Sequence, residues 1–317
     1  MNNIVNKLGF GGLLNLDEES INVRMHQIRD GYRLHSCFHY GKSLDVIKIA
    51  SNRVGIIPKI STKVYYNFHG EASYQGIHNN IYNQLELIVE RLGFIPKSWH
   101  IQLCNITDIR PFTILEFIEF KKKVKSNFGR VHFFVESFIF SEEKIKKIIL
   151  NNYVDGITFR DSAFDSQASQ EMRDYLIKNE INFSSYHGLS GVSNGVGKDS
   201  KILSILLNDT KIKTPLDLNL SFIKSQIGIP SFNYSVLSVS TIEHYQDLIK
   251  RLTDIDVLSQ EQAKLVEELK QESYSILAWS DDYGAAKKPT LSFIYMKHII
   301  RKLINRIKDL FNGRSWL

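Results

Sequence analysis

Residues 99–136 read WHIQLCNITDIRPFTILEFIEFKKKVKSNFGRVHFFVE. Two short runs rich in β-branched and aromatic residues, 99–104 and 131–136, flank a stretch at 113–127 that has a helical pattern. Short strand-like runs that alternate with helical stretches are typical of a parallel sheet built from βα units. This stretch therefore predicts one strand–helix–strand unit of such a sheet.

The same alternation continues in both directions along the chain. We expect strands near 7–10, 32–37, 57–63, 99–104, 131–136, 154–159, 181–186 and 234–239. The helices expected after them cover 18–29, 43–52, 78–92, 113–127, 141–150, 167–179, 216–226 and 241–252. This number of strand–helix units favours a closed α/β architecture, the (β/α)8 TIM barrel, which takes about 250 residues as one domain.

The chain of 317 residues is longer than such a barrel needs. We predict that residues 1–255 form the barrel and that residues 256–317 form a helical C-terminal extension. In the extension, a polar helix at 260–271 leads through a linker-like stretch, SDDYGAAKKP, to an amphipathic tail.

Composition excludes several classes of protein. Hydrophobic residues make up 43% and charged residues 23%, as in globular proteins, which excludes a disordered or collagen-like chain. Only two cysteines occur, Cys37 and Cys104, which excludes a disulfide framework and a four-cysteine zinc site and favours a reducing compartment. We find no signal peptide pattern and no long uncharged apolar run. We therefore expect a cytoplasmic protein that is neither secreted nor membrane-spanning.

The net charge of +6 is concentrated in the tail. Apolar residues from Phe293 to Leu310 recur at spacings of three and four, the pattern of a basic amphipathic helix. Two interpretations remain open: the apolar stripe packs on the barrel, or residues 290–311 contact an anionic membrane surface peripherally. A nucleic-acid partner is not expected, because the chain before the tail is nearly neutral. The tail's cations are Lys287, Lys288, Lys297, Arg301, Lys302, Arg306, Lys308 and Arg314, against the single acid Asp309.

In TIM barrels the chemistry lies at the carboxyl ends of the strands. The residues at the ends of the predicted strands are therefore the candidates for function. They are His35, His39, Tyr40, Lys63, Tyr65, Cys104, Asn105, Ser137, Arg160, Asp161, His187, Gly188, Gly191, Ser238 and Ser240.

Several stretches of the chain carry motif-like patterns in a consistent order: NKLGFGGL from residue 6, GYRLHSCFHYGKS from 31, ISTKVY from 60, RLGFIPKSWHIQLCN from 91 and SVLSVSTIEHYQDL from 235. Together they resemble the strand motifs of the aldo/keto reductases, a family of NAD(P)-dependent barrels. The resemblance covers roughly residues 5–252, and it implies the same barrel fold.

The resemblance also implies hydride transfer between NAD(P)H and a carbonyl or hydroxyl group of a small substrate. In the family a tyrosine donates the proton, and a neighbouring lysine lowers the pKa of that tyrosine. Tyr40 and Lys63 match these two residues. The aspartate that pairs with the lysine matches His35, so we expect Lys63 to lack its counter-ion. The histidine that orients the carbonyl matches Cys104, or Asn105 if the register shifts by one residue.

The resemblance implies a set of cofactor-binding positions as well. Family residues that contact the cofactor match Ser137, the loop residues Gly188, Leu189 and Gly191, and Ser238, Ser240 and Asp247. No arginine stands where the family grips a 2′-phosphate, so a preference for NADP is not indicated. The aromatic residues Tyr65, Tyr66, Phe68 and Trp99 lie near strand ends in the sequence. Two interpretations remain open: they line a substrate pocket with a sugar-like face, or they only close the barrel.

Three functions of different classes remain open. The first is a divergent NAD(P)H-dependent oxidoreductase that uses Tyr40 and Lys63. The second is a catalytically inactive barrel that binds a ligand or a partner, at a membrane surface through its tail. The third is a repurposed site in which His35, His39, Cys104 and Tyr40 perform nucleophilic or metal chemistry. The spacing of these four residues is not diagnostic of a metal site, and we expect no bound metal.

Overall fold

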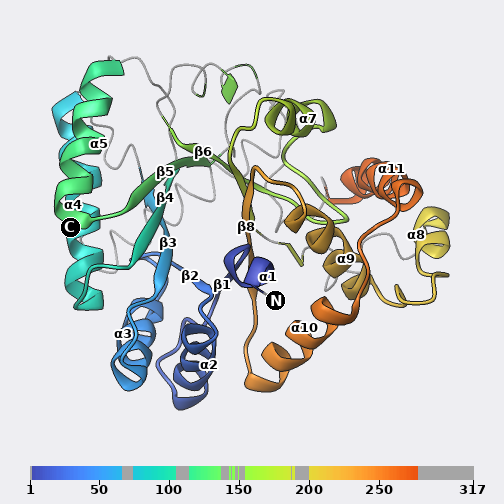
Figure 1. The fold of residues 1–317 in the computed structure, drawn as a ribbon, viewed down its shortest axis with the longest axis horizontal. Coiled ribbons are helices and arrows are strands. Elements are labelled where there is room, and N and C mark those ends of the chain that lie inside the picture. Colours follow the sequence, from blue (N-terminus) through green and yellow to red (C-terminus); the bar gives the residue numbers. More distant parts are fainter. Residues whose placement is uncertain are drawn as a thin grey trace, which may run out of the picture.

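Eight parallel strands close into a barrel in chain order, each paired with the next and β8 paired with β1 (Figure 1). The structure, a computed structural model, describes residues 2–65, 74–104, 114–136, 143, 145–146, 149, 154–186, 188–189 and 200–277. The strands are β1 (Leu8–Gly11), β2 (Arg33–Ser36), β3 (Lys59–Tyr65), β4 (Ser98–Cys104), β5 (Val131–Glu136), β6 (Gly156–Arg160), β7 (Phe183–Tyr186) and β8 (Phe232–Ser238). The TIM-barrel prediction is confirmed, and the strand limits differ from the predicted ones by two residues or fewer, as at β3, which runs to Tyr65.

The described helices surround the strands (Figure 1). Two short helices, α1 and α8, were not predicted, because a helix of one to two turns shows no readable periodicity. The helix predicted at 141–150 falls largely outside the described residues. The helices are α1 (Asn2–Asn6), α2 (Glu18–Arg29), α3 (Ser43–Val54), α4 (Tyr74–Leu92), α5 (Ile114–Phe128), α7 (Gln170–Lys178), α8 (Lys201–Leu206), α9 (Pro215–Ile227), α10 (Ile242–Asp254) and α11 (Gln260–Leu277).

Local capping residues decide where several helices begin. The Asp17 side chain accepts from the Ser20 N–H at the start of α2, and the Thr241 side chain accepts from the His244 N–H at the start of α10. Thr214 and Asp217 form a reciprocal capping box at the start of α9, with Pro215 in the first helical position. These caps satisfy N–H groups that lack a partner within the helix. The caps of α2 and α10 fix where the loops after β1 and β8 end.

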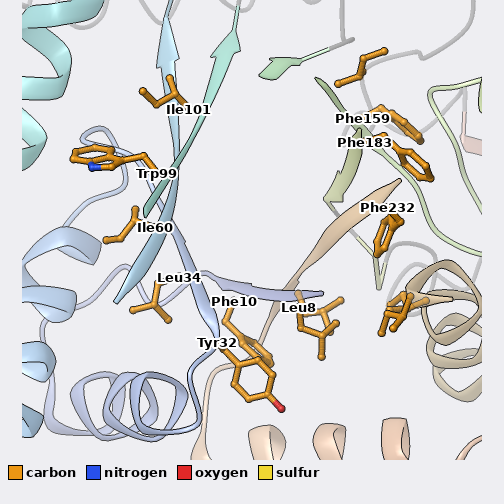
Figure 2. Packing of buried hydrophobic residues seen from close by; sticks show 14 of the residues in the cluster. Leu8, Phe10, Tyr32, Leu34, Ile60, Trp99, Ile101, Phe159, Phe183 and Phe232 are labelled. Carbon is orange, nitrogen blue, oxygen red and sulfur yellow. The ribbon is translucent and has the colours of Figure 1, made fainter. Parts of the chain in front are cut away.

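The hydrophobic core lies between the strands and the helices. Leu34, Ile60, Trp99 and Ile101 are fully buried, and they point away from the barrel axis (Figure 2). Side chains along a strand alternate between its two faces. Every second residue therefore belongs to this outer layer, and the residues between them face the barrel interior.

Polar and aromatic side chains meet in the barrel interior. Arg33 of β2 lies over the ring of Tyr234 of β8, 5.1 Å from its centroid, and the His100 ring of β4 is 5.1 Å from the same ring. Gln102 Nε2 donates to the Tyr234 hydroxyl at 3.3 Å. His132 of β5 lies 5.2 Å from His100, ring centroid to ring centroid. Residues from four strands thus meet inside the barrel and fill it, as is usual for a barrel of this size.

Among the helices of the described residues, none has both the length and the apolar character needed to cross a bilayer.

Candidate active site

Lys63 and Glu136 form an ion pair at the carboxyl end of the barrel. The Lys63 Nζ is 2.9 Å from the Glu136 Oε1, and the side chains are 18% and 9% exposed. The expectation that Lys63 lacks a counter-ion is therefore wrong. The carboxylate comes from the last residue of β5, two strands away, and not from the position on β2 that the family resemblance indicates.

Strand register explains this pairing. Lys63 pairs with Gln102 of β4, and Gln102 pairs with Phe134 of β5. Glu136 lies two residues after Phe134, so it is on the same inner face and nearer to the mouth of the barrel. Sequence reasoning missed Glu136 because it considered the residues after this strand and not the last residue in it. The two-residue alternation of His132, Phe134 and Glu136 is the signal that identifies it.

Tyr186 lies directly beside this ion pair. It is the last residue of β7, and the Lys63 Nζ lies 5.0 Å from the centroid of its ring. The Tyr186 hydroxyl donates to Gln167 Oε1 at 2.9 Å. Burial and the neighbouring Glu136 carboxylate raise the pKa of Tyr186 well above its ordinary value, against the opposing effect of Lys63. Tyr186 is therefore held as a neutral phenol, and it too was missed from the sequence.

The structure brings His35 and Tyr40 together. His35 is buried on β2, and its Nδ1 is 2.9 Å from the Ser61 Oγ. Tyr40 is half-buried in the turn after β2, and its ring centroid lies 6.0 Å from that of His35. Ser61 precedes Lys63 by two residues on β3, so His35 lies one layer below Lys63 on the inner face of the barrel.

The two cysteines differ in what the structure describes. Cys37 is fully buried, and burial raises the pKa of its thiol to about 11. It is a thiol at neutral pH and hence a poor nucleophile and metal ligand. The backbone of Cys104 ends β4, but its side chain lies outside the described residues. No group of three His, Cys, Asp or Glu side chains suited to a metal ion occurs in the part of the chain that the structure describes.

The end of β6 carries a buried network of charges. Arg160, the last residue of β6, forms an ion pair with Asp165. Asp161 accepts from Gln226 Nε2 at 2.5 Å, and its Oδ1 is 3.3 Å from the Nζ of Lys270 on α11. Burial lowers the pKa of Lys270 and raises that of Asp165. The structure thus uses Asp161 to attach α11 to the barrel.

The implied cofactor positions are only partly described. Ser137 and Gly191 lie outside the described residues. Gly188 is buried against β8, where a Cβ would approach Ser235 Oγ to 2.8 Å, and Leu189 is half-buried next to it. Ser238 and Ser240 are exposed, Ser240 Oγ is 3.1 Å from His244 Nδ1, and Asp247 forms an exposed ion pair with Arg251.

Two features test whether a nicotinamide dinucleotide fits these residues. Beside the Tyr186 hydroxyl, the Gln167 Nε2 is buried with no hydrogen-bond partner, so it is a donor available to a carboxamide oxygen. At the start of α10, by contrast, the Ile242 N–H donates to the Glu19 carboxylate at 2.9 Å. A carboxylate there opposes a phosphate at the same helix end. The described residues therefore fit the nicotinamide end better than the phosphate end.

The interpretation that Trp99 lines an aromatic substrate pocket is wrong. Trp99 is fully buried outside the barrel, in the layer under the helices, where its ring centroid lies 6.1 Å from that of Phe128. Successive side chains of a strand point to opposite faces, so Trp99 points outward because His100 points into the barrel. The side chain of Tyr65 and residues Tyr66 and Phe68 lie outside the described residues.

Comparison by sequence finds no matching family model and no matching curated protein. Comparison by structure finds aldo-keto reductases. An aldo-keto reductase from a Medee basin deep-sea metagenome has a TM-score of 0.62 at 13% identity over 84% of this chain and 91% of its own. The aldose reductase of Giardia lamblia has a TM-score of 0.62 at 13% identity, over 85% and 93%. The aldo-keto reductase of Klebsiella pneumoniae, in complex with NADPH, has a TM-score of 0.60 at 15% identity, over 83% and 90%. At these identities the likeness shows that the chain shares their barrel fold.

Proposed function

We propose that this chain is a divergent NAD(P)H-dependent oxidoreductase that acts on a carbonyl or hydroxyl group of a small substrate. The observation that carries the proposal is the Lys63–Glu136 ion pair, a shielded ammonium held at the carboxyl end of the barrel. A charge is costly to bury, so a lysine kept there with a carboxylate partner fits a chemical role. The structural neighbours with bound NADPH support the choice of cofactor.

Tyr40 is the proposed proton donor. When bound, the nicotinamide supplies a hydride to the carbonyl carbon. The carbonyl oxygen then takes the phenolic proton of Tyr40. In this proposal, which follows the family resemblance, the Lys63 ammonium stabilises the negative charge left on the phenolic oxygen. In the oxidation direction, the same phenolic oxygen accepts the proton of the substrate hydroxyl.

Tyr186 is a second tyrosine at the site, and its environment argues against this role. Its raised pKa, caused by burial and Glu136, opposes loss of the proton. We assign to Tyr186 an aromatic surface at the inner wall of the site, with Gln167 Nε2 as an adjacent donor. By the family resemblance we propose Cys104, or Asn105 in the shifted register, for the role of orienting the carbonyl; the weak S–H donor of a cysteine in that role predicts slow turnover.

We also propose the cofactor-binding positions that the family resemblance implies. Ser137, Gly188, Leu189 and Gly191 would flank the nicotinamide and pyrophosphate, and Ser238, Ser240 and Asp247 the adenosine. We place the protein in the cytoplasm, because Cys37 is a free thiol and the chain has only two cysteines.

The alternative is a catalytically inactive barrel that binds a ligand or partner, with residues 290–311 in peripheral contact with a membrane. The Glu19 carboxylate at the start of α10 favours this alternative, because it opposes a bound phosphate. The same observation predicts weak binding of the dinucleotide if the first proposal holds.

Titration of the purified protein with NADH and NADPH, monitored by intrinsic fluorescence, distinguishes the oxidoreductase from the inactive barrel. The control is Lys63→Met, which removes the ammonium and keeps a side chain of similar length. Micromolar quenching that Lys63→Met abolishes supports the oxidoreductase. The absence of quenching by either nucleotide up to millimolar concentration contradicts it and favours the inactive barrel.

A further inference from the structure

Two neighbouring loops at the amino end of the barrel carry the same three residues. Ile57-Pro58-Lys59 leads into β3, and Ile95-Pro96-Lys97 leads into β4. The Lys97 N–H donates to the Pro58 carbonyl at 3.0 Å, so the loops lie side by side. Figure 2 shows the continuation of this pairing, with Ile60 and Trp99 next to each other on β3 and β4.

The isoleucines of these loops are exposed although the prolines are buried. Ile57 is 50% exposed, Ile95 45%, and the adjacent Ile56 43%. Singly exposed apolar residues are common and need no explanation. Here three of them lie on two bonded loops, so they form a small apolar surface at this end of the barrel. The buried prolines hold both loop backbones in place, because proline fixes its φ angle.

Cations surround this apolar surface. Arg33 and Lys59 are the first residues of β2 and β3, and Lys97 and Arg130 immediately precede β4 and β5. The amino ends of successive parallel strands lie at the same end of a barrel, so these four residues follow one another in an arc. Arg33 is buried over Tyr234, Lys59 is half-buried, and Lys97 and Arg130 are exposed. We name this arc the basic rim: Arg33, Lys59, Lys97 and Arg130.

The charge of the basic rim is not neutralised. No ion pair within the described ranges involves any of its four residues, and the Lys59 ammonium donates instead to the neutral Asn6 Oδ1 at 2.8 Å. Burial lowers the pKa of Lys59, and the charges of Arg33, Lys97 and Arg130 lower it further. The binding of an anion beside these cations would relieve their mutual repulsion.

We propose that the amino end of the barrel docks on an anionic lipid surface through Ile56, Ile57 and Ile95 and the cations Lys59, Lys97 and Arg130. Isoleucine side chains at loop ends can enter the headgroup region of a bilayer, while lysine stems extend to the phosphates. A fluid lipid surface adapts to isolated apolar side chains, whereas a protein partner needs a matching hollow. The opposite end of the barrel, which holds Lys63, then faces the solvent.

The test is co-sedimentation of the full chain with vesicles of phosphatidylcholine, with or without phosphatidylserine. We expect binding only to vesicles that contain phosphatidylserine. Lys97→Glu/Arg130→Glu should reduce the affinity at least about tenfold, because one cation near such a surface contributes a factor of about five. Ile57→Ser/Ile95→Ser should reduce it severalfold.

Matched variants on other faces control for net charge and apolarity. Lys178→Glu/Lys250→Glu reverses two exposed lysines, and Ile177→Ser/Ile205→Ser replaces isoleucines that are 40% and 58% exposed. Both should bind like the unaltered chain. Circular dichroism melting of every variant excludes unfolding as the cause of any loss.

Every variant keeps residues 290–311, so the tail cannot account for a difference between them. Full binding by the rim variants would assign the binding elsewhere and overturn the proposal. Failure of the unaltered chain to bind anionic vesicles would overturn it as well. Rim-dependent binding to polyglutamate that matches binding to vesicles would indicate an acidic protein partner instead.

Discussion

The ammonium of Lys63 on β3 and the carboxylate of Glu136 on β5 lie 2.9 Å apart, with β4 between their strands. The ion pair joins β3 to β5 across the intervening strand and holds the ammonium in place at the mouth of the barrel. It also provides a counter-ion that the family resemblance places elsewhere.

Glu136→Gln should destabilise the protein, because it leaves the Lys63 ammonium shielded from water without this carboxylate. Loss of one partner of a buried pair costs about 3 kcal/mol or more. Urea unfolding at neutral pH measures the loss. The double variant Lys63→Met/Glu136→Gln should regain part of it, and an equal or greater loss in the double variant would contradict a direct interaction.

Tyr40→Phe should lower turnover by about 10²-fold or more, because it removes the proposed proton donor. Its melting temperature should change little, since Tyr40 is only half-buried. Tyr186→Phe should keep most of the activity, because its raised pKa holds the phenol neutral. Steady-state kinetics on the two variants decides between them, and a greater loss in Tyr186→Phe would reverse the assignment.

Lys270→Met should loosen α11 from the barrel. It removes the ammonium bonded to Asp161 and Glu267 and leaves those carboxylates in a buried network. Hydrogen exchange over 260–271 should become faster, and the free energy of unfolding should fall by about 3 kcal/mol. Lys264→Met is the matched control on the exposed side of the same helix, and it should behave like the unaltered protein.

The stability should fall as the pH decreases below the ordinary histidine range. Burial and the charges of Arg33, His132 and Arg130 hold the pKa of His100 well below its ordinary value of 6.5. The unfolded chain therefore binds a proton at His100 in the window below 6.5 where the folded protein does not, and protonation favours unfolding. The slope is at most about 1.4 kcal/mol per pH unit for one such group.

His100→Gln removes that group and should flatten the pH dependence in urea unfolding series. His132 contributes in the same direction, because burial also lowers its pKa. His244 is exposed on α10, and His244→Gln is the control that should leave the slope unchanged. An unaltered slope in His100→Gln would show that His100 is not the group that titrates.

Much of the fold follows from local sequence pattern. The run VHFFVE predicts β5 at its observed limits, and the helix expected at 18–29 coincides with α2. Both patterns depend on side-chain alternation and periodicity within one element, which a short window of sequence contains. The short helices α1 and α8 have too few turns for such a pattern, and they were missed.

Only part of the candidate site could be predicted from the sequence. Carboxyl-end reasoning found Lys63, His35 and Tyr40 without any cross-strand information. It missed Glu136 and Tyr186, which are the last residues of their strands, and it placed Trp99 on the wrong face. These three depend on which face of a strand points inward and on which residue of another strand lies opposite.

The sequence by itself determined the order of strands and helices, the barrel class and the strand ends at which polar residues collect. The tertiary structure alone decided the partners: Glu136 for Lys63 at a separation of 73 residues, Asp161 for Lys270 at 109, and the two bonded Ile-Pro-Lys loops. The physical reason is that periodicity is a property of neighbouring residues, whereas an ion pair depends on distance in space. That distance is set only when the register of every intervening strand and the closure of the barrel are specified together.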